Sequence, residues 1–393
     1  MSYREAVAEA LRELDLAINA TWRLGQYMVV GWSHEGPTVH LCVVPTQRVF
    51  EASVTVPQVF QGQRHMAPEP FLDLCKDMQS RPTRIVLPLP VGDGKEELPP
   101  AVIDNLIRRY SVTRTAHRAV MLFDIVGFSR ASSIEQVAQL NSLEYSINGA
   151  NKKLRQVGMD AELARSTVGD GFYVWNRMTG LQADIATYIS LILILADNAH
   201  ARREGQPGFV PVMRSCYAIG PHYSYHQVEG TSPRGFEYIV GEVTITLARL
   251  ISKTLANQVV IGAFRRPLDN VPGREVDTPM FMTQAAAAMA KLAGSGMEIG
   301  DYPLTELRSY LTGAELKDGR YGVEGFKIKD KHGYLHECFN ANVVLVDESG
   351  GRSELGMKRS ALQEFEAERF RYDLSAEQMV KMFAQMKETA AAS

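Results

Sequence analysis

The stretch FDIVGFS, residues 123–129, decides the fold of this chain. It closes an apolar run over 119–124 that predicts a β-strand ending at Asp124. The Ser132-x-x-Glu135 spacing that follows is typical of a capping box, so we expect a helix to begin near residue 132. The carboxylate then lies beside a turn and a helix N-terminus, whose backbone N–H groups are suited to binding phosphate.

A second aspartate stands in STVGDGF, residues 166–172. Strands predicted over 161–167 and 172–175 flank a Gly-Asp-Gly turn, where glycine supplies the positive φ, and place Asp170 at the tip. Adjacent strands would bring Asp170 to Asp124, and two carboxylates beside a phosphate site favour Mg²⁺ or Mn²⁺. Spacing alone leaves a second interpretation open, a pair of turn-capping aspartates, because Asp beside Gly is common in turns.

Hydrophobic periodicity around these motifs predicts the order β-α-β-β-α-β-β-α-β. The further elements of this order are a helix over 132–157, a buried helix through 185–196, strands near 212–219, 223–228 and 258–261, and a helix near 242–253. Before them we expect helices over 5–22 and 101–110 and short strands at 27–32, 40–44 and 52–56. After them we expect a helix over 283–292, a hairpin at 326–330 and 334–346, and two C-terminal helices, the second from Ser375.

These elements predict an α+β protein with three parts. A segment rich in proline and glycine, 88–100, breaks both helix and sheet and is typical of a linker. It follows a small α+β domain, residues 1–95, to which the sequence assigns no role. A central domain over 96–267 contains both aspartates, and a C-terminal α/β extension over 268–393 contains the hairpin and the last helices.

Composition limits the classes of partner. The chain has 393 residues, with 42 Lys and Arg against 45 Asp and Glu, and a pI of about 6.3, so we expect binding to neither nucleic acid nor membrane. The four cysteines show no CxxC spacing, which argues against a zinc ribbon or a disulfide framework. The N-terminus lacks the pattern of a signal peptide, and the apolar run 185–196 is shorter than the roughly 20 residues of a membrane span. We therefore expect a cytoplasmic protein.

Four motifs in order carry a family resemblance. FDIVGFS, STVGDGF, AIGPHYS and YIVGEVTITLARL, the last followed by ANQVVIG, resemble the catalytic domain of class III nucleotidyl cyclases over about residues 115–265. The resemblance implies a ferredoxin-like cyclase core that acts as a homodimer. It also implies the reaction, in which a nucleoside triphosphate is converted to a 3′,5′-cyclic nucleotide and pyrophosphate.

The resemblance further implies the site residues. Two Mg²⁺ or Mn²⁺ ions per site would be held by Asp124 and Asp170, with the carbonyl of Ile125 as a further ligand. Arg249 would stabilise charge on the α-phosphate across the dimer. The β- and γ-phosphates would be cradled by Gly127, Phe128 and Ser129.

The chain departs from the family at the helix that carries Arg249. Four residues before this arginine, Ile245 stands where the family usually has an asparagine that orients the ribose. Loss of one such donor typically costs about 10²–10³ in rate. Thr244 and Thr246 flank the position and are candidates to replace the asparagine.

The chain also departs at both base-reading positions. Ser166 replaces the family's purine-binding lysine and Tyr238 replaces its aspartate or cysteine, so neither the ATP nor the GTP pattern is present. Hydroxyl groups both donate and accept hydrogen bonds, and the bulk of Tyr238 would shrink the pocket, which together favour a pyrimidine, UTP before CTP. The chain is similar in this respect to the pyrimidine cyclases of anti-phage Pycsar systems. That similarity implies a second messenger with a downstream cyclic-nucleotide receptor.

Two alternatives stay open at the level of sequence. One is an adenylate or guanylate cyclase with a divergent base pocket. The other is a degenerate cyclase-homology module that binds nucleotide or dimerises without turnover, for which Ile245 is the best evidence. Arg265 and Arg266, after the last core strand, are either solvated surface charges or a phosphate contact.

Overall fold

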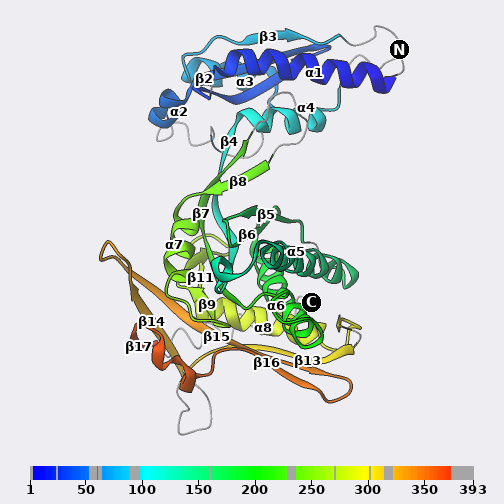
Figure 1. The fold of residues 1–393 in the computed structure, drawn as a ribbon. Coiled ribbons are helices and arrows are strands. Elements are labelled where there is room, and N and C mark those ends of the chain that lie inside the picture. Colours follow the sequence, from blue (N-terminus) through cyan, green and yellow to red (C-terminus); the bar gives the residue numbers. More distant parts are fainter. Residues whose placement is uncertain are drawn as a thin grey trace. The chain divides into compact units, whose positions relative to one another are not determined.

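The computed structural model describes residues 3–23, 25–52, 60, 64–88, 98–159, 161–227, 236–269, 271–300, 302–313 and 322–372. It divides into two compact units, Met1–Thr115 with His222–Val240, and Ala116–Pro221 with Gly241–Ser393 (Figure 1). The predicted boundaries near residues 95 and 267 stay predictions.

The first unit contains a three-stranded antiparallel sheet in the order β1-β2-β3. Its centre is Trp32, fully buried, whose indole Nε1 donates a hydrogen bond to Asp104 at 3.0 Å. The helix predicted over 5–22 and the first two strands are confirmed, whereas most of the strand predicted at 52–56 and of the linker lies outside the described residues. The elements are α1 (Tyr3–Trp22), β1 (Tyr27–Glu35), β2 (Thr38–Pro45), α2 (Thr46–Ala52), α3 (Pro68–Asp77), β3 (Thr83–Val86), α4 (Pro100–Ile107) and the 3₁₀ helix η2 (Arg108–Tyr110).

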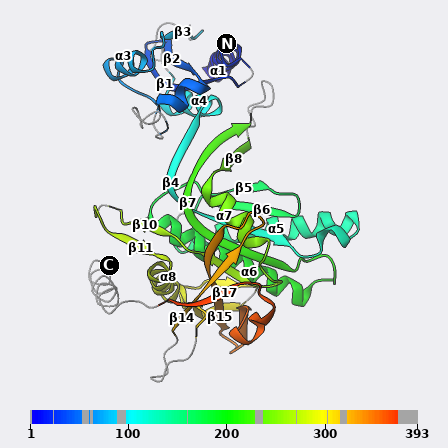
Figure 2. The same ribbon diagram turned by 90° about the vertical axis from the view of Figure 1, so that its left-hand side faces the viewer.

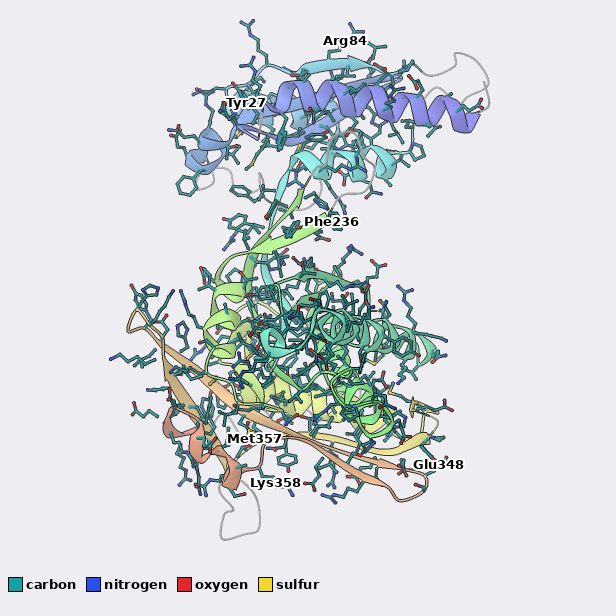
Figure 3. All side chains as sticks on the ribbon, in the orientation of Figure 1. Tyr27, Arg84, Phe236, Glu348, Met357 and Lys358 are labelled. Atoms are coloured by element: carbon teal, nitrogen blue, oxygen red, sulfur yellow. The ribbon has the colours of Figure 1, made fainter. Side chains whose placement is uncertain are left out.

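The α+β prediction is confirmed in the second unit. Strands lie side by side in the order β9-β7-β4-β6-β5, and helices α5 and α6 pack together against them (Figures 1 and 2). Side chains from both helices fill the space against the sheet (Figure 3). The elements that follow η2 in the chain are β4 (Val112–Ile125), η3 (Phe128–Arg130), α5 (Ser133–Gln156), β5 (Leu163–Thr167), β6 (Gly171–Asn176), α6 (Leu181–Glu204), β7 (Met213–Gln227), β8 (Phe236–Val240), α7 (Glu242–Ile251) and β9 (Val259–Gly262). Of these, the start of β4, the end of β7 and all of β8 belong to the first unit.

The predicted capping box and the predicted buried helix are both confirmed. The backbone N–H of Ser132 donates to the Glu135 carboxylate at 2.7 Å, which begins α5. Among the described helices, α6 is the one that is long and apolar enough to cross a membrane, and 78% of its most apolar window is buried inside the protein. Residues 185–196 therefore form the central helix of the core.

Strand β7 corrects one prediction. The sequence predicts two separate strands here, near 212–219 and 223–228. The structure has one continuous strand, Met213–Gln227. Glycine allows α7 to pack closely against the strand here, since a Cβ at residue 220 would make a tight contact of 3.2 Å with the Cβ of Val243.

The C-terminal third continues the same sheet. Strand β15 pairs antiparallel with β9, with Phe339 opposite Ile261, and residues from both strands share one hydrophobic core. The first predicted C-terminal helix is wrong, because a 3₁₀ helix and a strand occupy that region, and the helix from Ser375 lies outside the described residues. The elements are β10 (Arg265–Pro267), β11 (Glu275–Asp277), α8 (Thr278–Leu292), β12 (Glu298–Ile299), β13 (Tyr302–Leu311), β14 (Val323–Lys329), β15 (Leu335–Asp347), β16 (Arg352–Gly356), η4 (Arg359–Glu364) and β17 (Glu368–Tyr372).

Candidate functional site

The structure brings the two motif aspartates together. Asp124, near the end of β4, lies opposite Gly171 in the register with β6, and the N–H of Ile125 donates to the carbonyl of Asp170 at 2.9 Å. A Cβ on Gly171 would lie 1.9 Å from the carbonyl oxygen of Phe123, so only glycine allows this approach. The end of β4 and the β5–β6 turn are thereby held as one edge, as the sequence predicts.

Charge is poorly balanced at this edge. Burial raises the pKa of Asp124, the guanidinium of Arg214 opposes that rise, and the neighbouring carboxylate of Asp170 raises the pKa further. The two carboxylates are therefore close enough to repel each other. An additional cation at this edge would relieve the repulsion.

Arg214 is a site residue that sequence reasoning missed. From the start of β7, its Nε donates to the Asp124 carboxylate and its Nη1 donates to the carbonyl of Thr254 at 3.1 Å. The available signal was a single arginine in the apolar run 212–219, where a charge needs a partner. Its partner, Asp124, became visible only when β7 and β4 were placed side by side.

The residues at the edge fit a hard divalent cation. Mg²⁺ and Mn²⁺ prefer oxygen ligands, and Mg²⁺ is commonly held by one or two carboxylates together with substrate phosphates. Asp124 and Asp170 supply such a carboxylate pair with mutual repulsion. No group of three or more His, Cys, Asp and Glu side chains with the arrangement of a metal site occurs in the described part of the chain. A metal here would therefore depend on ligands from the substrate.

The segment after Asp124 forms a fixed turn. Gly127 has φ of +73° and precedes the 3₁₀ helix η3, whose first carbonyl, that of Phe128, accepts from the N–H of Ala131 at 3.1 Å. The side chain of Gln136 on α5 donates to the same carbonyl at 3.1 Å. Gly127 and Ser129 are exposed, so the predicted phosphate cradle has an ordered backbone and an open surface.

On helix α7 the Arg249 side chain is accessible, whereas the Thr244 hydroxyl is used within the helix itself. The Thr244 hydroxyl accepts from the N–H of Gly241 at 3.1 Å and donates to the carbonyl of Gly241 at 2.9 Å, so it is committed to the helix start. Ile245 is 55% exposed. Arg249, four residues further and hence on the same helix face, forms an ion pair with Asp330 at 3.4 Å. Thr244 is thus a poor replacement for the missing asparagine.

The two base-reading candidates lie in different units. Ser166, half-buried on β5, stands opposite Tyr173, whose hydroxyl donates to the carbonyl of Thr244 at 3.0 Å. Tyr238, on β8, stacks on Tyr225 with ring centroids 5.5 Å apart. Ser166 belongs to the second unit and Tyr238 to the first. The surroundings of each residue are therefore described separately.

Arg266 fits neither interpretation made from the sequence. It is 2% exposed, and its guanidinium donates to Asp184 at 2.5 Å and to Asp269 at 2.9 Å. Asp184 also accepts from the N–H of Ala119 at 2.8 Å, while burial raises its pKa to about 6 against the opposing effect of Arg266. Arg266 is therefore part of a buried structural ion pair, whereas Arg265 is exposed.

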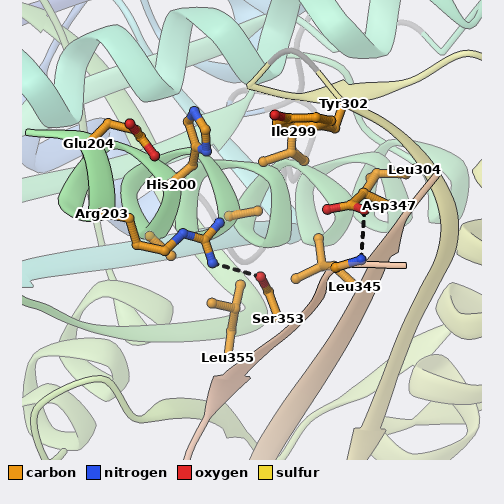
Figure 4. A pocket seen from close by; sticks show the side chains of 13 residues that line it. His200, Arg203, Glu204, Ile299, Tyr302, Leu304, Leu345, Asp347, Ser353 and Leu355 are labelled. Carbon is orange, nitrogen blue, oxygen red and sulfur yellow. Dashed lines mark hydrogen bonds between the residues drawn. The ribbon is translucent and has the colours of Figure 1, made fainter. Parts of the chain in front are cut away.

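A separate cavity of about 180 Å³ lies between the end of α6 and strands β13, β15 and β16 (Figure 4). Arg203 donates to the Ser353 hydroxyl at 2.9 Å on its wall. Its lining includes none of the predicted site residues. The cavity is therefore a feature of the C-terminal third and distinct from the aspartate edge.

Comparison with known proteins gives similarity at the level of structure. No family model matches the chain, and no curated protein matches it. The chain is similar to the guanylate cyclase domain of RhGC from Catenaria anguillulae in complex with GTP, with 15% identity, 58% of this chain and 97% of that chain covered, and a TM-score of 0.34. It is similar to the adenylyl cyclase CyaB from P. aeruginosa, with 16% identity, 42% and 93% covered, and a TM-score of 0.30.

A third similar structure is the non-canonical dimeric guanylyl cyclase domain of the RhoGC fusion protein from Blastocladiella emersonii, with 16% identity, 42% and 95% covered, and a TM-score of 0.30. All three are cyclase domains, the family that the sequence motifs resemble. Because these identities and TM-scores are low, we take the function from the residues of this chain.

Proposed function

We propose that this chain is a nucleotidyl cyclase, converting a nucleoside triphosphate to a 3′,5′-cyclic nucleotide and pyrophosphate. The observation that carries the proposal is the convergence of Asp124 and Asp170 at one edge of the sheet, with repelling carboxylates and an exposed turn beside them. A pair of aspartates that only capped turns would not need to place two carboxylates next to each other, because neighbouring like charges destabilise the fold.

In this proposal the chain's residues bind and orient the triphosphate. Asp124 and Asp170, with the carbonyl of Ile125, would hold two Mg²⁺ or Mn²⁺ ions. When bound, these ions would lower the pKa of the ribose 3′-hydroxyl and neutralise charge on the triphosphate. The β- and γ-phosphates would contact the exposed turn formed by Gly127, Phe128 and Ser129.

The reaction needs only positioning and charge stabilisation from the protein. The ribose 3′-oxygen forms a bond to the α-phosphorus, the bond from that phosphorus to the bridging oxygen breaks, and pyrophosphate leaves with the electron pair. The hydroxyl proton passes to water or to a phosphate oxygen. Arg249, supplied by the partner copy in a homodimer, would donate to the α-phosphate as charge develops there.

We further infer that the base is a pyrimidine, UTP before CTP. Ser166 and Tyr238 support this, because neither supplies the ammonium or carboxylate expected for a purine edge. The stack of Tyr238 on Tyr225 adds support, since a stacked ring keeps its bulk in one place. The product would serve as a second messenger for a cyclic-nucleotide receptor, in a cytoplasmic anti-phage system that binds neither nucleic acid nor membrane.

A degenerate module that binds nucleotide without turnover is the second candidate. It is favoured by the exposed Ile245 and by the commitment of the Thr244 hydroxyl to its own helix. Incubation of the purified chain with all four NTPs and Mn²⁺, with products identified by mass, separates the two candidates. A cyclic monophosphate supports the cyclase, and nucleotide binding without any cyclic product supports the module.

A further inference from the structure

The C-terminal hairpin holds a carboxylate against Arg249. Strand β15 contacts α7 (Figure 1). Asp330 follows directly after the last residue of β14. Its Oδ2 lies 3.4 Å from the Nε of Arg249. Both residues belong to the second unit, although Asp330 lies far outside the region of cyclase motifs.

Asp330 is fixed without any help from the arginine. Its Oδ1 accepts from the backbone N–H groups of His332 and Tyr334 at 2.9 and 3.0 Å, and the His336 imidazole Nε2 lies 3.2 Å from its Oδ2. Desolvation alone would raise its pKa, but the hydrogen bonds from His336, His332 and Tyr334 lower it to about 2. Its side chain is 5% exposed. The hairpin thus presents a fixed, ionised carboxylate to α7.

The contact with Asp330 leaves the terminal nitrogens of Arg249 available for other partners. A guanidinium has five N–H donors, one on Nε and four on its two terminal nitrogens. An ion pair through Nε consumes none of the four terminal donors, which are those that match phosphate oxygens in pairs. The Arg249 side chain keeps 29% exposure, so it is also reachable from outside.

The Arg249–Asp330 ion pair contributes little to the stability of the fold. An ion pair with a partly exposed arginine contributes little to stability, because water screens the charges and the long side chain loses rotamer freedom. The hairpin turn is already closed by the N–H groups that bind Asp330, and by the N–H of Gly333, which donates to the Asp330 carbonyl at 3.0 Å. What the pair does provide is a single direction for a long, flexible side chain.

We propose that Asp330 is a positioning residue for the cyclase reaction, holding Arg249 by Nε so that its terminal nitrogens are presented to the α-phosphate. This inference rests on the proposed function. It gives the C-terminal extension a part in catalysis, because the extension then orients a group that acts on the reacting phosphate.

The test is Asp330→Asn in the full chain, with kcat and KM measured for the preferred NTP with Mn²⁺. Asparagine keeps an oxygen for the two turn N–H groups and replaces the charged oxygen that faces Arg249 and His336 by an uncharged NH₂ group. Because misplacing a reacting group costs up to about a hundredfold, we expect kcat to fall about ten- to a hundredfold. KM should change less than about threefold, since the loss lies in the transition state.

Asp347→Asn is the matched control. Asp347 closes the β15–β16 turn in the same way, accepting from the N–H of Gly351 at 2.8 Å and from the Ser349 hydroxyl at 2.5 Å, whereas the ion pair of Arg249 is made with Asp330. We expect it to keep wild-type kcat. Equal losses in both variants would mean that any turn-closing carboxylate of the C-terminal third matters equally, and not the Arg249 contact, which overturns the inference.

A double-mutant cycle keeps the test decisive if Asp330→Asn lowers stability. In an Arg249→Ala background, Asp330→Asn should cost no further kcat, because there is no guanidinium left to position. An equal loss in both backgrounds overturns the inference, as does an Asp330→Asn variant with unchanged or raised kcat in an active protein. A wild-type chain that makes no cyclic nucleotide removes the proposed function, and this inference with it.

Discussion

Two aspartate–arginine pairs stand in the same unit, Asp124 with Arg214 and Asp184 with Arg266, and they differ in what surrounds them. The Asp184 and Arg266 side chains are 1% and 3% exposed, and every partner they need is in place: a backbone N–H for the aspartate, a second carboxylate for the arginine. The Asp124 and Arg214 side chains are 13% and 30% exposed, and their third partner is another carboxylate, Asp170, which repels the first.

The difference separates a structural pair from a functional one. In both pairs burial raises the pKa of the aspartate and the arginine opposes the rise. Each pair combines two carboxylates with one arginine, but only the Asp124 pair is open to solvent, so only it can take up a further cation. Titratable groups with strongly shifted pKa values gather at functional sites. A raised pKa alone does not separate Asp124 from Asp184, so the exposure and the partners of each group must be considered too.

The largest effect expected is loss of nearly all cyclisation in Asp124→Ala or Asp170→Ala. Each change removes a carboxylate from the open edge and little core volume, so thermal unfolding should stay close to wild type. The measurement is cyclic nucleotide formed per minute with Mn²⁺, and Asp73→Ala, an exposed aspartate on α3, is the control. Near-wild-type turnover in either variant would show that the edge is not the metal site, and the Asp124 pair would then be as structural as the Asp184 pair.

The buried pair should give the second largest effect, on stability instead of activity. Arg266→Met leaves Asp184 charged and without its main partner in the core, which should cost about 3–5 kcal/mol of unfolding free energy. Arg214→Met should cost less, because the Asp124 and Arg214 side chains are more exposed to water than those of the buried pair. Urea denaturation of both variants, with exposed Arg265→Met as control, measures the difference. Equal costs would mean that the two pairs play the same structural role.

Sequence and structure agree where a motif contains its own geometry. FDIVGFS and STVGDGF each combine a strand, a glycine turn and an aspartate, so the convergence of Asp124 and Asp170 follows from adjacent pairing alone. Arg214 lies 90 positions from Asp124, and Arg266 lies 82 from Asp184. Neither pairing has a local signature, because each depends on which strands become neighbours.

The C-terminal third shows the same limit. Its strands β13, β16 and β17 were not predicted, since β13 and β17 pair mainly with strands that are not their neighbours in the chain and β16 is a short strand with no buried residue. The predicted hairpin was correct, yet nothing in its residues indicated that Asp330 would face Arg249. The cyclase-like motifs end near residue 265, whereas the sheet and its hydrophobic core continue beyond that residue.

Base preference should give a smaller effect and tests what lies around the open edge. With the four NTPs at equal concentration we expect cUMP, or failing that cCMP, in excess. Ser166→Lys combined with Tyr238→Asp should reduce the pyrimidine preference about tenfold, since one hydrogen bond is worth roughly 1 kcal/mol. Mass spectrometry of the mixed products gives the ratio. A wild type that makes mainly cAMP or cGMP refutes the pyrimidine pocket and leaves the cyclase proposal standing.

The smallest effect expected is a partial recovery, and it tests whether the open edge is completed by a second copy. If Arg249 acts across a homodimer, Asp124→Ala chains lose nearly all activity and Arg249→Ala chains keep only a small residual activity, but a heterodimer of the two has one intact site. Random exchange makes half of the dimers heterodimers, so about a quarter of wild-type activity should return on mixing.

Arg266→Met provides the contrast, because its defect lies within its own chain and mixing with Asp124→Ala should add nothing beyond its own folded fraction. Subunit exchange is followed by mass difference between tagged copies. If exchange is complete and no activity returns, the aspartates and Arg249 act within one chain, and the open edge is then as self-contained as the buried pair.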